Sequence, residues 1–232
     1  MVAALLAACH GPHRVVGSVV TRDSGLPRLD AAITAFDQAR TRVLTSTADL
    51  VAAALALDAA DEACAAGALK AAATARTRAR AATPKGRTAL AGLPMRLTAY
   101  AAALSELTVA AQAAHGLSDA QRQAVADVVT GGQAEHDAAD AFGVAGRAAW
   151  PAYADLDAAQ LTWLDRRLAG WYRDQQEAAA AYAVLVRDGR PALQRARTLL
   201  ERVDAARRPV SERERAAVAA ADVALASLRT PG

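Results

Sequence analysis

The side chains best suited to metal chemistry near the start of the chain are one thiol and two imidazoles. They are Cys9, His10 and His13, in the stretch "CHGPH". Thiolate and imidazole are ligands that Zn²⁺ and copper favour in proteins. Three ligands on a segment rich in Gly, Pro and Ser do not make a closed coordination site, so we predict no metal there.

A second group of ionisable side chains lies in "EHDAAD", where His136 and Asp140 are one helical turn apart. That spacing suits a shared metal ion or a carboxylate that orients a histidine. A di-metal helical bundle needs Glu-x-x-His twice, but glutamine stands three residues before each helical histidine, so we expect a solvated acidic face. The sequence has no Gly-rich phosphate loop or nucleophile motif, and we predict neither catalysis nor a cofactor.

The residues that precede Cys9 bear on location. Leu6-Ala7-Ala8-Cys9 resembles the lipobox of bacterial lipoproteins, in which a signal peptidase cuts before a cysteine that then carries lipid. The resemblance implies a lipid anchor on Cys9, a membrane partner and a position in the cell envelope on the extracytoplasmic side. Residues 10–27, rich in Gly, Pro and Ser, would then be a flexible tether. The other interpretation is an ordinary N-terminus with an incidental cysteine and a cytoplasmic protein.

Basic residues gather between Glu62 and Glu106, a stretch without Asp or Glu. Within it we expect "TPKGR" at 83–87 to be the turn between the first two helices. A basic tip of this kind would attract anionic lipid headgroups, acidic wall polymers or nucleic acid, and a merely solvated loop is the alternative. Nucleic acid is the least favoured partner because the stretch has no aromatic residue before Tyr100. The candidate contact residues are Lys70, Arg76, Arg78, Arg80, Lys85 and Arg87.

Most aromatic residues lie in the second half of the chain. Trp171 and Tyr182 fall on the apolar stripe of an expected helix and are predicted to be in the core. Trp163 lies off that stripe, one turn from Arg166 and Arg167, and exposed Trp beside Arg is the composition of a protein-contact hot spot. We name these three residues as candidate partner contacts, and burial of Trp163 beneath another helix is the alternative that we favour.

Helices must position all of these side chains. Alanine makes up more than a quarter of the 232 residues, and apolar residues recur at steps of three, four and seven. Both features predict an all-α fold, and short connections predict antiparallel neighbours. We therefore expect an elongated antiparallel bundle of about five to six helices, with a long first helix and coiled-coil-like seams. The domain organisation would be a signal and tether over 1–27 and one helical bundle over 28–232.

Glycine, proline and capping residues set the expected boundaries. The first helix should begin near Leu29 and run to about residue 82, unless Gly67 breaks it. Ser118 and Gln121 form a capping box at the start of a later helix. Cys64 falls on an apolar face, which predicts a buried free thiol. Further breaks are expected at Gly116, Pro151, Gly189 and 208–210.

These features favour a binding or spacing function over chemistry. The net charge of +3 gives no general case for nucleic-acid binding. Our first hypothesis is a non-enzymatic, lipid-anchored bundle of the cell envelope with an envelope partner. The alternatives are a cytoplasmic helical adaptor or self-associating coiled-coil protein, and a polyanion or nucleic-acid binder that uses the basic tip. Homo-oligomers stay open because a long apolar seam can pair between chains as easily as within one.

Overall fold

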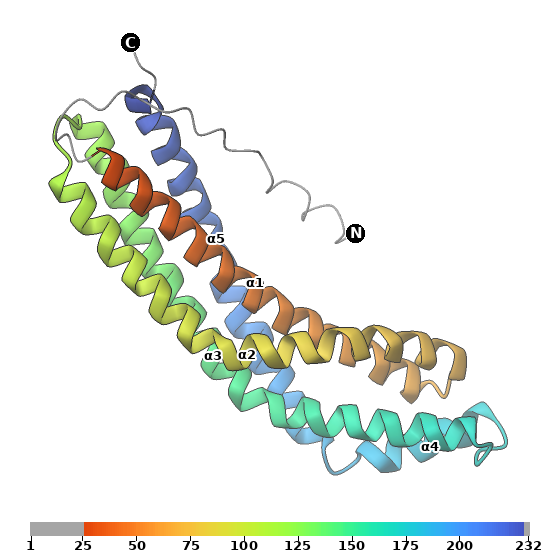
Figure 1. Ribbon diagram of the computed structural model, residues 1–232. Helices are drawn as coiled ribbons and strands as arrows, with labels where there is room; N and C mark the ends of the chain where they lie inside the picture. The colour runs from red at the N-terminus through yellow and green to blue at the C-terminus, as the bar shows by residue number, and fades with distance from the viewer. Residues whose placement is uncertain (1–25, 230–232) are drawn as a thin grey trace.

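The computed structural model describes residues 26–229, and its regular structure over that range is entirely α-helical. It confirms the all-α class and the elongated antiparallel bundle with a long first helix (Figure 1). Cys9 and residues 10–25 of the predicted tether lie outside the described residues. The helices are α1 (Leu26–Ala65), α2 (Leu69–Ala113), α3 (Asp119–Leu168), α4 (Gln175–Val186) and α5 (Arg190–Arg229).

The helices form four columns with two poles. α1 and α2 make one antiparallel hairpin, α3 packs on both, and α4 and α5 follow one another back along α3 as the fourth column (Figure 1). The start of α1 at Leu26, the α2–α3 turn at 114–118 and the end of α5 lie together at what we call the proximal pole. The α1–α2 turn at 66–68 and the α3–α4 connection at 169–174 form the distal pole.

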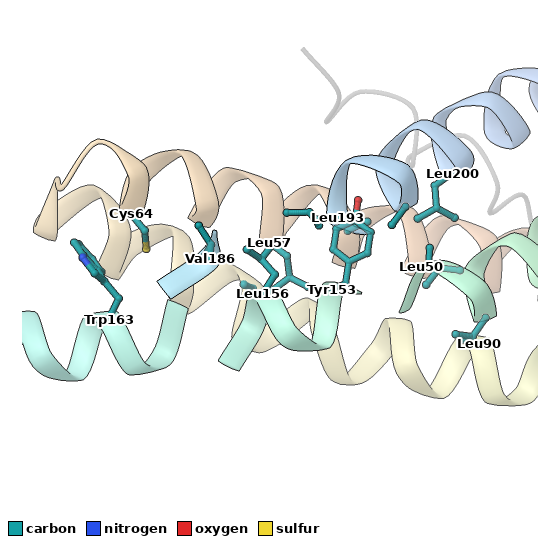
Figure 2. Close-up of a cluster of buried hydrophobic side chains, with 14 of the residues drawn as sticks. Leu50, Leu57, Cys64, Leu90, Tyr153, Leu156, Trp163, Val186, Leu193 and Leu200 are labelled. Carbon is teal, nitrogen blue, oxygen red and sulfur yellow. The ribbon is translucent and has the colours of Figure 1, made fainter. Parts of the chain in front are cut away.

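The core runs the length of the bundle as two successive clusters. The proximal cluster takes residues from α1, α2, α3 and α5, with Phe36 stacked on Tyr100 at 5.4 Å between ring centroids. The distal cluster adds α4 and is built around Trp163, Tyr153 and Leu57 (Figure 2). Each long helix contributes to both clusters, so its buried face is continuous from pole to pole.

Small residues let the columns approach closely, as the alanine content predicts. A Cβ at Gly86 of α2 would lie 2.5 Å from the Cβ of Ala53 on α1. A Cβ at Gly132 of α3 would lie 2.6 Å from a methyl of Leu104. Since such distances are closer than real Cβ contacts, glycine sets the spacing between helices at these levels.

The predicted turn at 83–87 is wrong. α1 ends at Ala65, the chain reverses through Gly67 with φ +66, and α2 continues without a break through 83–87. Glycine adopts this left-handed conformation without the steric penalty of a Cβ. The basic residues therefore follow the side of α2 from the distal pole toward the middle of the bundle and do not surround a tip.

The breaks predicted at Pro151 and 208–210 are also wrong, because α3 continues through Pro151 and α5 through Pro209. α2 likewise contains Pro84 and Pro94. All four prolines are exposed, and core packing on both sides holds each helix together although proline removes a backbone hydrogen bond.

Other local predictions are confirmed. Gly116 has φ +81 in the α2–α3 turn, and Gly189 lies between α4 and α5. Ser118 Oγ accepts a hydrogen bond from the backbone N–H of Gln121 at 3.3 Å. The side-chain oxygen of Gln121 accepts one from the backbone N–H of Ser118 at 2.8 Å, which completes the capping box. Cys64 is a buried free cysteine.

Within residues 26–229, α1 alone is long and apolar enough to cross a membrane, with a mean hydropathy of 1.5 over an 18-residue window. Of that window, 44% is buried inside the bundle. A core helix meets the same criterion, and the apolar face of α1 is occupied by α2 and α3. Core packing therefore accounts for the buried part of that window.

Candidate functional site

Five of the six cations predicted to form a contact surface are exposed along α2. None of the five forms an ion pair with any side chain of the described chain. Arg78 and Lys85 are seven residues apart, as are Arg80 and Arg87, so each pair repeats on one flank of the helix at about 10.5 Å along its axis. We call this set the basic strip: Lys70, Arg78, Arg80, Lys85 and Arg87.

Arg76 does not belong to the basic strip, and its prediction as a surface contact is wrong. Its side chain is 6% exposed and faces α3. The guanidinium donates to Asp157 at 2.6 Å and to the side-chain oxygen of Gln160 at 2.8 Å. Gln160 in turn donates to the carbonyl oxygen of Leu57 at 2.8 Å. Arg76 thus links α2 and α3 inside the bundle.

An open groove runs beside the first turns of the basic strip, between the end of α1 and the start of α2. Its floor is mostly alanine, and Lys70 and Arg78 lie along it. The alanines are Ala59, Ala63, Ala68, Ala71 and Ala75. The distal pole therefore offers cations beside a shallow apolar floor.

The two tryptophans near the distal pole differ in burial. Trp163 is completely buried, its indole N–H donates to the carbonyl oxygen of Ala178 at 2.8 Å, and its ring meets Tyr182 edge-on at 5.9 Å. Its assignment as a partner contact is wrong, while burial beneath another helix (α4 in this case) is confirmed. Tyr182 is in the core, as predicted.

Trp171 is exposed over 66% of its surface, which contradicts its predicted place in the core. α3 ends at Leu168, so Trp171 falls in the connection to α4 and leaves the helical stripe. The Arg166 guanidinium lies over the Trp171 ring at 5.4 Å from its centroid, and Arg167 donates to the carbonyl oxygen of Tyr172 at 2.8 Å. The exposed Trp–Arg pair is therefore Arg166 with Trp171.

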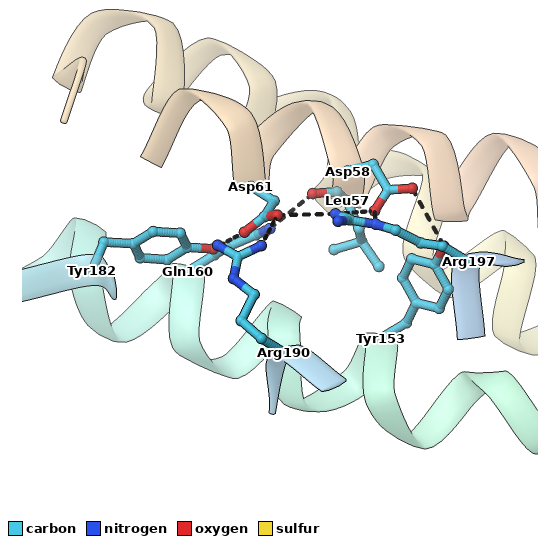
Figure 3. Close-up of polar contacts among 8 residues, drawn as sticks. All are labelled: Leu57, Asp58, Asp61, Tyr153, Gln160, Tyr182, Arg190 and Arg197. Carbon is cyan, nitrogen blue, oxygen red and sulfur yellow. Dashed lines mark hydrogen bonds and ion pairs between the residues drawn. The ribbon is translucent and has the colours of Figure 1, made fainter. Parts of the chain in front are cut away.

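An ion network centred on the buried Asp61 joins α1 to α5 and was not predicted. Asp61 accepts hydrogen bonds from Tyr182 at 2.7 Å, Arg190 at 2.5 Å and Arg197 at 2.9 Å (Figure 3). Arg197 also donates to Asp58 at 2.8 Å. The aspartates lie one turn apart on α1 and the arginines two turns apart on α5, a spacing that was visible in the sequence. Only the tertiary structure pairs them.

Burial and hydrogen bonding set the electrostatics of this network in opposite directions. Burial raises the pKa of Asp58 despite its bonds from Arg197 and Tyr153. Burial would do the same at Asp61, but the hydrogen bonds from Arg190, Tyr182 and Arg197 outweigh it and lower the pKa of Asp61. Burial, with the nearby Asp61 charge, raises the pKa of the Cys64 thiol to about 12. The Asp61 carboxylate accepts three side-chain hydrogen bonds, and the Cys64 thiol keeps its proton at neutral pH. We therefore assign this network a structural role, in which it holds α1 against α4 and α5.

A second buried polar group lies in the proximal half. Glu135 of α3 accepts from Arg40 of α1 at 2.7 Å and from the Tyr100 hydroxyl of α2 at 3.2 Å. The expected solvated acidic face is wrong at Glu135, which is 1% exposed. His136 stacks on Tyr100 and lies 3.2 Å from Asp137. No group of three metal-binding side chains occurs in the part of the chain that the structure describes.

In comparisons with protein-family models, curated proteins and solved structures, the chain matches none of them. Its candidate sites therefore stand on their geometry, as an exposed basic strip, an exposed Trp–Arg pair and two buried polar groups.

Proposed function

We propose that this protein is a non-enzymatic, lipid-anchored helical bundle of the cell envelope that holds a binding surface away from the membrane. The observation that supports this most is the placement of the two poles. The described chain begins at the proximal pole, whereas Trp171 and the first residues of the basic strip lie at the distal pole (Figure 1). α1 has 40 residues and separates the poles by about 60 Å.

An anchor at Cys9 would tie the proximal pole to the lipid. The distal pole would then project outward with its exposed cations and the Arg166–Trp171 pair. Such a surface suits an envelope partner that carries negative charge, because no cation of the basic strip forms an ion pair with a side chain of residues 26–229. The length of the helices would thus set the distance between the membrane and the distal pole. The exposed residues of the distal pole would bind the partner.

The anchor is tested by expressing the chain, with an upstream start if the gene has one, in a bacterium that processes lipoproteins. We expect the membrane fraction to contain a chain that begins at Cys9 and carries added acyl mass. Cys9→Ser should move the protein to the soluble fraction, while Cys64→Ala, a change at the other cysteine, should leave it with the membrane. Unmodified wild-type protein in the soluble fraction would contradict the proposal and favour a cytoplasmic adaptor.

A second candidate function, polyanion binding, is favoured by the unpaired cations of the basic strip. Polyphosphate is a suitable probe because it carries charge without base or sugar chemistry. We expect its affinity to fall as salt rises, and neutralising Arg78, Arg80 and Arg87 with glutamine should reduce the logarithmic salt slope by up to about 1 per residue.

The matched control changes three exposed arginines elsewhere, Arg122, Arg147 and Arg215, to glutamine. It removes the same net charge from other faces of the bundle. An equal loss of affinity in the two triple variants would show a response to net charge alone and would reject the basic strip as the site.

A further inference from the structure

Glu214 of α5 is completely buried, and neither of its carboxylate oxygens has a hydrogen-bond partner among the described residues. It lies against Gly131 of α3, where a Cβ would be 2.0 Å from Oε2 of Glu214. Glycine at 131 makes room for the carboxyl group but supplies no side chain to pair with it. A carboxylate buried in this way would pay a large desolvation cost without compensation.

The charged groups around Glu214 are already balanced without it. Arg40 of α1 is the cation that faces it, and its Nε donates to Glu135 of α3 at 2.7 Å. Arg40 Nη2 reaches the other Glu135 oxygen and the carbonyl oxygen of Ser211, each at 3.4 Å. The α2 neighbour is Tyr100, whose hydroxyl also donates to Glu135. Arg40 and Glu135 form an ion pair whose charges cancel. An ionised Glu214 would add a second negative charge with no cation to balance it.

We propose that Glu214 is protonated in the folded bundle and acts as a pH-sensitive latch that holds the C-terminal half of α5 against α3. When the carboxyl group loses its proton to solvent, a negative charge is left opposite Glu135 in an apolar environment. Hydration of that charge requires α5 to move away from Gly131. The part of α5 beyond Glu214 would move with it, because both belong to one continuous helix. That movement would withdraw Ala221 and Leu225 from the proximal cluster.

The electrostatics agree with this geometry. Burial, and after it the Glu135 charge, raise the pKa of Glu214, while Arg40 lowers it; together they raise this pKa to about 8. Between the ordinary glutamate pKa and about 8, the open or unfolded state binds fewer protons than the folded state. Stability therefore falls as pH rises through that window, with the opening equilibrium constant increasing by up to about tenfold per pH unit.

The latch is tested by amide hydrogen exchange and urea unfolding at about pH 6 and about pH 9. In the wild type at the higher pH, we expect the amides of 211–226 to exchange faster after correction for the intrinsic effect of pH on exchange. We also expect a lower urea concentration at the unfolding midpoint. Glu214→Gln keeps the shape and cannot ionise, so both differences should largely disappear. Glu212→Gln, at an exposed position two residues earlier, is the control and should keep the wild-type pH response.

A second readout detects the protonated carboxyl group of Glu214 directly. The infrared C=O stretch of a protonated carboxylic acid should be present in the wild type at neutral pH and absent from Glu214→Gln. The latch is overturned if the wild type lacks this band, if the band persists in the variant, or if the variant keeps the full pH dependence of exchange.

Discussion

The side-chain amide of Gln175 donates a hydrogen bond of 2.7 Å to the carbonyl oxygen of Ala66, and this contact joins the two turns of the distal pole. Gly67 lies so close beneath the Gln175 backbone that a Cβ there would be 2.1 Å from its carbonyl oxygen. The start of α4 therefore packs against the α1–α2 turn. This contact brings Lys70 and Trp171 to the same pole, as the proposed binding surface requires.

Gly67→Ala should destabilise the bundle by about 3 kcal/mol or more, because it adds a backbone clash to the strain of a positive φ. Gly116→Ala is the matched control, since Gly116 has φ +81 but a Cβ there would have no atom within 4 Å. This substitution should lower the unfolding free energy by about 1–2 kcal/mol. Urea unfolding of the two variants measures the difference. Equal costs would mean that the Gln175 contact does not constrain the turn.

Trp163→Ala should cost about 3–5 kcal/mol of unfolding free energy, because it removes a buried ring and its hydrogen bond to Ala178. Trp171→Ala removes a ring of the same size that is 66% exposed, so it should change stability by less than about 1 kcal/mol. Unfolding followed by circular dichroism compares the two variants. A larger cost at Trp171 than at Trp163 would contradict the assignment of core and surface.

Asp61→Asn should destabilise the bundle by about 2–4 kcal/mol at neutral pH, because it leaves Arg190 and Arg197 without their shared carboxylate. The pKa of Asp61 is lowered in the folded state, so its contribution is present above the ordinary aspartate pKa and is lost as pH falls through the folded value. The difference between wild type and variant should thus narrow below about pH 4.

Glu62→Gln is the control for Asp61→Asn, since Glu62 is the next residue and is exposed. It should change the unfolding free energy by less than about 0.5 kcal/mol. If the two variants are equally stable from acid to neutral pH, the network between α1 and α5 contributes nothing to the fold.

Gly131→Ala should cost about 2–3 kcal/mol, because its methyl group would collide with the Glu214 carboxyl group. In a Glu214→Ala background the collision is absent, and the same substitution should cost less than about 1 kcal/mol. The double-mutant cycle, measured by urea unfolding, reports the coupling between the two positions. Additive costs would show that Gly131 and Glu214 are not in contact.

Local features of this protein were predictable because the information lies within a few residues. The capping box needs only Ser118 and Gln121, and the left-handed turn at Gly116 needs only its own backbone. Burial of Cys64 follows from its helical register. The errors occur where a local signal competes with packing, as at Pro151 and Pro209, where flanking core contacts keep the helices continuous.

By itself the sequence determined an all-α, antiparallel bundle, because alanine content and the 3–4 apolar spacing act along the chain. Only the tertiary structure decided that Trp163 is buried and Trp171 exposed. It also paired Arg40 with Glu135, 95 residues apart, and Arg190 with Asp61, 129 residues apart. The physical reason is that charge partners and core positions depend on which helix faces meet across the bundle, and no short-range pattern records that choice.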